Sequence, residues 1–133
     1  MNVNRSEQAV YNKHHGYNCC QSVLSVFEED LPLDAEKLRA LGSCFCIGMG
    51  STEGTCGALT AAEMILGMRR YCGRPQIAES RELFEAFKKE AGASVCSDLK
   101  GLKTGEVLCS CDRCIEIAVK LLEERFKDED ALY

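Results

Sequence analysis

Cysteine is the residue type that most limits what this chain can fold into. Ten of its 133 residues are cysteines. In a secreted protein, an even number of cysteines would predict a disulfide framework. The opening segment MNVNRSEQAVYNKHHGYN has no apolar stretch of the kind that a secretory signal contains. We therefore expect a cytoplasmic protein, in a reducing environment where thiolates bind metal or carry out redox chemistry.

The rest of the composition is that of an ordinary globular protein. Hydrophobic residues make up 46% and charged residues 28%, and 133 residues suit one core, so we expect a single domain over residues 1–133. The net charge of −5 provides no basic surface, which argues against a nucleic-acid partner. No apolar run approaches the roughly 18 residues that span a bilayer, so we expect no membrane insertion.

Apolar residues recur at helical spacing, and no segment alternates with period two. This pattern predicts an all-α bundle of about five helices, with Asp34 as an N-cap and Gly92 ending a helix. The expected helices cover residues 17–29, 34–45, 56–70, 75–91 and a last segment from residue 111. Between the second and third lies a Gly/Cys-rich loop, residues 42–57, whose five glycines suit a close backbone approach. The stripe of Leu83, Phe84 and Phe87 is either core or the face of a homodimer.

Three cysteines, Cys19, Cys56 and Cys111, fall at predicted helix starts. A fourth, Cys96, stands before a short turn over residues 96–101, which could form one helical turn. A helix start carries unpaired N–H donors and partial positive charge, both of which stabilise a thiolate. Cysteines at several helix starts can therefore converge on one point of a bundle. The alternative for any single cysteine is a small buried hydrophobe, which wins about half the time. Cys20 and Cys114 sit beside apolar positions, and Cys72 is expected to be incidental.

The densest cluster is the C-x-C-x-x-C run of Cys109, Cys111 and Cys114. A C-x-x-C pair is typical of zinc sites, iron–sulfur sites and redox dithiols. Without a second C-x-x-C the chain is not a zinc ribbon, and the spacing is not that of a bacterial or plant-type ferredoxin. Cys44 and Cys46 form a further close pair.

Several short motifs resemble those of a known family over about residues 16–126. They are Gly16-Tyr-Asn-Cys19-Cys-Gln-Ser-Val, Gly48-Met-Gly50, Thr55-Cys56-Gly57-Ala58, Leu66-Gly67, Cys96-Ser-Asp-Leu-Lys-Gly101, and Cys111 with Ile115 and Ala118. The family is that of small redox-active proteins named for their cysteine pattern, C_GCAxxG_C_C or CGCAxxGCC. The resemblance implies that Cys19, Cys56, Cys96 and Cys111 are its four marked cysteines. It departs at Ala61, where the family motif has a glycine that leaves more room.

The resemblance also implies a redox role, because the family's members are expected to be redox proteins of anaerobic bacteria and archaea. It extends to a domain of split-Soret cytochromes that holds an iron–sulfur cluster. By that analogy, the four marked cysteines would be the ligands, and the loop glycines, Gly50 and Gly57 among them, would donate N–H groups to sulfur. The further candidate ligands are Cys20, Cys44, Cys46, Cys109 and Cys114.

Three functions stay open from the sequence. The first is an iron–sulfur protein that transfers electrons to an unidentified redox partner protein. The second is a metal-free thiol–disulfide protein, cycling Cys19 with Cys56 or Cys111 with Cys114. The third is a structural zinc site. No motif for one substrate's chemistry is present, so the sequence leaves open whether the chain is an enzyme.

Overall fold

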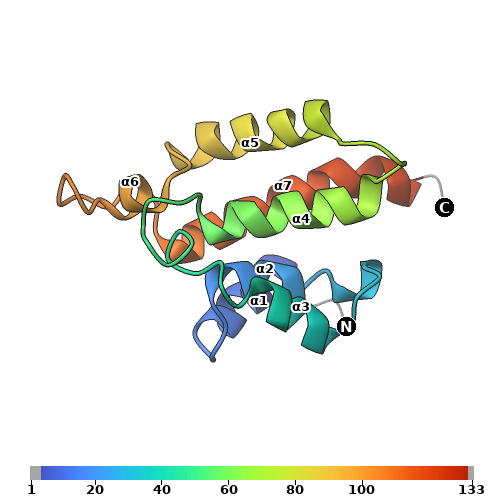
Figure 1. The fold of residues 1–133 in the computed structure, drawn as a ribbon, viewed down its shortest axis with the longest axis horizontal. Helices are drawn as coiled ribbons and strands as arrows, with labels where there is room; N and C mark the ends of the chain where they lie inside the picture. Colours follow the sequence, from blue (N-terminus) through green and yellow to red (C-terminus); the bar gives the residue numbers. More distant parts are fainter. Residues whose placement is uncertain (1–3, 132–133) are drawn as a thin grey trace.

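Seven α-helices and one short 3-10 helix make up the secondary structure of residues 4–131, which the computed structural model describes (Figure 1). Within this range the only β-type pairing is an isolated bridge between Thr55 and Val95. The predicted all-α class is confirmed, and the predicted count of about five helices is wrong. The elements in chain order are α1 (Arg5–Lys13), α2 (Cys19–Ser25), η1 (Glu28–Asp30), α3 (Ala35–Gly42), α4 (Gly57–Arg70), α5 (Ile77–Ala91), α6 (Cys96–Lys100) and α7 (Cys111–Ala131).

The two helices beyond the predicted set, α1 and α6, are short. Helix α1 is mostly polar and buries only Ser6 and Ala9, so it offers too few apolar positions for a helical period to be visible. Helix α6 has five residues and reads as a turn in the sequence. Local hydrogen bonds, rather than a periodic apolar pattern, identify these segments as helices. In α1, for example, the Glu7 backbone N–H donates to the Asn4 side chain.

Two predicted helices are shorter than expected. The segment predicted as one helix over residues 17–29 ends as α2 at Ser25, and a 3-10 turn follows it. Helix α3 starts after its predicted N-cap Asp34 and stops at Gly42 rather than residue 45. In both cases an aromatic side chain just beyond the helix extended the apolar pattern past the last helical hydrogen bond. These side chains are Phe27, which is fully buried, and Phe45, which is partly buried.

The core lies between three layers of helices (Figure 1). Helices α4 and α7 pack on each other at the centre, α5 covers one side, and α1, α2 and α3 cover the other. Leu83 and Phe87 of α5 are fully buried and Phe84 is half-buried, so this stripe is core in the single chain. Far from the start of α7, Phe27 meets Phe126 edge to face, with ring centroids 6.5 Å apart.

Within 4–131 no helix combines the length and the hydropathy needed to cross a bilayer.

Candidate functional site

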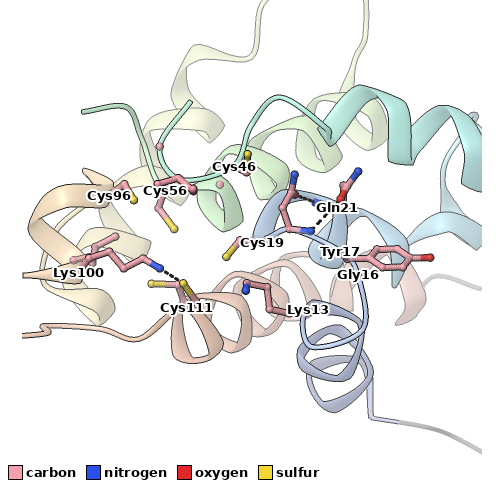
Figure 2. A pocket seen from close by; sticks show the side chains of 16 residues that line it. Lys13, Gly16, Tyr17, Cys19, Gln21, Cys46, Cys56, Cys96, Lys100 and Cys111 are labelled. Carbon is pink, nitrogen blue, oxygen red and sulfur yellow. Dashed lines mark hydrogen bonds between the residues drawn. The ribbon is translucent and has the colours of Figure 1, made fainter. Parts of the chain in front are cut away.

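Four cysteines stand at the starts of four helices, three of them at helices that the sequence predicts and Cys96 at a segment predicted as a turn. Cys19, Cys96 and Cys111 are the first residues of α2, α6 and α7. Cys56 is the N-cap of α4, one residue ahead of the predicted position, and no side chain, including that of Thr55, caps this helix. The four helix starts lie toward the same end of the molecule (Figures 1 and 2).

All four of these cysteines line one cavity, which we call the thiol cavity (Figure 2). Its volume is about 550 Å³. Cys46 and Cys114 line it too, so six of the ten cysteines meet there. The other lining residues are Lys13, Gly16, Tyr17, Asn18, Gln21, Ile47, Gly48, Gly57, Leu99 and Lys100.

A short pairing of two loop segments sets Cys56 beside Cys96. The backbone N–H of Cys56 donates to the Ser94 carbonyl at 2.8 Å, and that of Cys96 donates to the Gly54 carbonyl at 3.0 Å. These bonds flank the isolated bridge between Thr55 and Val95. Two residues 40 positions apart in the sequence are thereby fixed in register.

Helix α2 is held against α3 by its own cap. The Asn18 side chain accepts from the Gln21 backbone N–H, and Gln21 accepts from the Asn18 N–H, which completes a capping box. The free ends of both amides donate to α3, Asn18 Nδ2 to the Gly42 carbonyl at 3.0 Å and Gln21 Nε2 to the Arg39 carbonyl at 2.8 Å. The start of α2, where Cys19 lies, is therefore held by its own capping box and by two hydrogen bonds to α3.

Glycines allow the loop to close over the thiol cavity. A Cβ on Gly57 would lie 2.6 Å from the Phe45 carbonyl oxygen. At Gly48, φ is +61° and a Cβ would lie 2.5 Å from the Cβ of Cys96. Of the two glycines named from the sequence, Gly57 lines the cavity, whereas Gly50 is exposed and is not among its lining residues. Gly48, from the same loop, and Gly16, ahead of α2, are the other two lining glycines.

Lys100 and Lys13 bring positive charge to the thiol cavity. Lys100 is half-buried on α6 and its Nζ donates a hydrogen bond to Cys111 Sγ (Figure 2). Lys13, at the end of α1, lines the cavity as well. Neither lysine was identified from the sequence. The signal for Lys100 is its position four residues after Cys96, which places both on one face of a helix.

The electrostatics of the thiols differ from one to the next. A hydrogen bond from the Cys114 thiol lowers the pKa of Cys56, and the backbone N–H groups of Leu59 and Ala58 add to this effect. The same bond, together with burial, raises the pKa of Cys114. Burial and the charge of Cys56 raise the pKa of Cys19 to about 11, and burial raises the pKa of Cys96. Among Cys19, Cys56, Cys96 and Cys114, Cys56 is thus the thiol that ionises first.

The remaining cysteines do not line the thiol cavity. Cys20 is fully buried in the core, where burial raises its pKa to about 12, and Cys109 is 5% exposed. Cys44 is exposed, as is Cys72, whose Sγ accepts from Gln76 Nε2 at 3.3 Å. Among the five further candidates from the sequence, the structure therefore brings only Cys46 and Cys114 to the four.

None of the ten cysteines is in a disulfide, so all ten thiols are free. Across residues 4–131, no three His, Cys, Asp or Glu side chains are gathered closely enough to hold a single metal ion. His14, which precedes Cys19, is exposed and pairs with Asp112 at 2.9 Å. Ala61, at the position where the family motif has glycine, is buried in the core and does not line the cavity.

Comparisons with known proteins give one match. A family model described as "Putative redox-active protein (C_GCAxxG_C_C)" matches residues 17–125, and this range contains every cysteine of the thiol cavity. Searches of curated proteins and of solved structures returned no match.

Proposed function

Since this chain belongs to the C_GCAxxG_C_C family, we propose that it is a redox protein in which Cys19, Cys56, Cys96 and Cys111 hold an iron–sulfur cluster. The cluster would serve electron transfer with a separate redox partner protein. One observation carries the proposal. Four cysteines from four different helix starts line a single cavity.

The donor set suits such a group. Iron–sulfur clusters are held by four thiolates, and the thiol cavity offers that number with two further thiols beside them. When bound, a cluster supplies one-electron chemistry at a potential set by its surroundings. The N–H groups of Ala58 and Leu59 already stabilise negative charge on Cys56, and hydrogen bonds of this kind to ligand sulfur tune such sites.

The test is anaerobic purification followed by counts of iron, zinc and acid-labile sulfide per chain. We expect iron and sulfide together with broad visible absorption that dithionite bleaches. Serine substitution at each of Cys19, Cys56, Cys96 and Cys111 should lower the iron content. Matched controls are Cys44→Ser and Cys72→Ser, which remove exposed thiols outside the cavity and should leave it unchanged. A colourless protein with titratable thiols would overturn the proposal, and zinc alone would indicate a structural site.

A second function is favoured by the presence of Cys56 and Cys114 in the lining of the same cavity, where the Cys114 thiol lowers the pKa of Cys56. A thiolate beside a second thiol is the arrangement of a thiol–disulfide protein. The Cys56 thiolate would attack a disulfide of a partner, and Cys114 would then displace the partner thiolate. The chain gains one disulfide while the partner gains two thiols. Mass spectrometry of the metal-free protein after exposure to oxidised glutathione checks this function. It requires a Cys56–Cys114 disulfide that forms reversibly.

A further inference from the structure

Two ammonium groups face the thiols across the thiol cavity. Lys100 reaches in from α6 and donates a hydrogen bond to Cys111 Sγ, while Lys13 lines the cavity from the end of α1 (Figure 2). Lys100 is half-buried, and an ammonium group loses favourable hydration when it leaves water. Its position therefore needs compensation by negative charge nearby, which the thiolates of the cavity would supply.

We propose that Lys100, assisted by Lys13, supplies the positive charge that sets the reduction potential of the thiol cavity. This inference rests on the proposed function, in which the cavity holds an iron–sulfur cluster. It assigns to Lys100 a role toward that group that is separate from ligation.

The physical argument is electrostatic. Reduction moves one electron from a one-electron reductant into the site, and in this chain no bond forms or breaks and no proton moves. The site thereby gains one negative charge. A fixed positive charge inside a cavity of low dielectric lowers the energy of the reduced state more than that of the oxidised state. The midpoint potential with Lys100 present is therefore higher than it is without Lys100.

Lys100 faces all four cysteines. It lines the thiol cavity together with Cys19, Cys56 and Cys96, and its direct contact is with Cys111. Lys13 lines the same cavity from the end of α1. We therefore treat Lys100, which bonds to a proposed ligand, as the stronger of the two charges.

The test compares four variants with the wild-type protein. Lys100→Gln removes the charge, Lys100→Arg keeps it, and Lys13→Gln removes the assisting charge. Lys103→Gln is the matched control, because Lys103 is exposed, follows α6 directly and does not line the cavity. It changes the net charge of the protein by the same amount. Iron and sulfide are counted for each protein, and the midpoint potential is then measured by anaerobic titration followed in the visible spectrum.

We expect a more negative potential for Lys100→Gln, a smaller shift in the same direction for Lys13→Gln, and values near wild type for Lys100→Arg and Lys103→Gln. Each 59 mV corresponds to a tenfold loss in the equilibrium constant for one-electron reduction. Wild-type potential in Lys100→Gln, or equal shifts in Lys100→Gln and Lys103→Gln, would overturn the inference while the cluster itself stands.

Two further outcomes distinguish failure of this inference from failure of the proposed iron–sulfur function. A wild-type protein without iron overturns both. If Lys100→Gln fails to assemble the site, Lys13→Gln decides, since an unchanged potential there overturns the inference and a more negative one supports it.

Discussion

At Gly57, the absence of a side chain lets the start of α4 approach the loop ahead of it. The same residue type at Gly67, further along this helix, has no neighbour within 4 Å of an added Cβ. Gly57 is therefore required by a close backbone contact, whereas Gly67 is not. Alanine substitution at each position distinguishes the two cases.

Gly57→Ala should lower the free energy of unfolding by about 1–3 kcal/mol, because the added methyl group must displace the Phe45 backbone. Gly67→Ala should instead raise it by about 0.5–1 kcal/mol, since alanine is the better residue in a helix interior. Urea unfolding of both variants, with iron content, checks the pair. Equal effects on stability would contradict the steric role of Gly57.

Cys20 makes the stability of the metal-free protein depend on pH. Burial raises its pKa to about 12, whereas the unfolded thiol ionises near its ordinary value of about 8.5. Between these values the unfolded chain loses a proton that the folded chain keeps, so stability falls as pH rises. Cys19, with a pKa raised to about 11, acts in the same direction. Cys56, whose pKa is lowered, acts in the opposite direction as pH falls below about 8.5.

Cys20→Ala should therefore flatten the decline in unfolding free energy above about pH 8.5 by up to about 1.4 kcal/mol per pH unit. Urea unfolding of reduced, metal-free protein at several pH values measures the slope. The exposed thiol of Cys72 provides the control, and Cys72→Ser should keep the wild-type slope. A Cys20→Ala slope equal to that of wild type would show that the thiol ionises alike in both states.

At this scale, the sequence could predict four of the six cysteines that line the thiol cavity, because three of these four fall at predicted helix starts and Cys96 at a predicted turn. It could not separate Cys46, which lines the thiol cavity, from Cys44, which is exposed. These two lie in a loop where Ile47 and Met49 have positive φ, a conformation that no residue pattern specifies for such side chains. For the same reason, the sequence pointed to Gly50, which is exposed, rather than to Gly48, which lines the thiol cavity.

Among the elements, α2 depends most visibly on its cap. Asn18→Ala removes the capping box and the bond to the Gly42 carbonyl, and we expect a loss of about 1 kcal/mol or somewhat more in unfolding free energy. Because Cys19 is the next residue, the variant should also hold less iron. Denaturant unfolding and iron analysis measure the two effects.

Helix α3 supplies the matched control. Its N-cap Asp34 accepts from the Lys37 backbone N–H at 2.9 Å and lies outside the thiol cavity. Asp34→Ala should cost a similar amount of stability and leave the iron content as in wild type. Loss of iron in both variants would mean that the site responds to general stability rather than to the position of α2.

The sequence predicted the long helices better than the short ones. Helix α5 ends at Ala91 with Gly92 in the left-handed region, as expected, and α7 starts at the predicted Cys111. Helix α6 was expected only as a turn, although it carries Cys96 and Lys100. Five residues cannot display a helical period, and its length is set by Gly101, where a Cβ would lie 1.9 Å from the Glu106 carbonyl oxygen.

At the scale of the whole molecule, the thiol cavity joins α2, α4, α6 and α7, which otherwise meet through the core. A ligand bound by thiols from all four should stabilise the fold as a unit. Removal of iron with a chelator should therefore lower the melting temperature. Amide hydrogen exchange should rise most at the starts of α6 and α7.

The opposite end of the molecule tests whether this effect is local. Phe126 lies near the end of α7, whose first residue lines the cavity, and Phe27 packs against it. Amides near them should exchange at nearly the same rate with and without iron. A uniform rise across α7 would indicate that the cavity contributes to global stability alone.

The order in which these cysteines leave the ribosome follows from their places along the chain. Cys19 belongs to the second helix and Cys111 to the last. At roughly 5–20 residues per second, the interval between their synthesis is on the order of 5–20 seconds. Any ligand of all four thiols must therefore arrive after translation has passed α7, and Cys19 has to stay reduced through that interval.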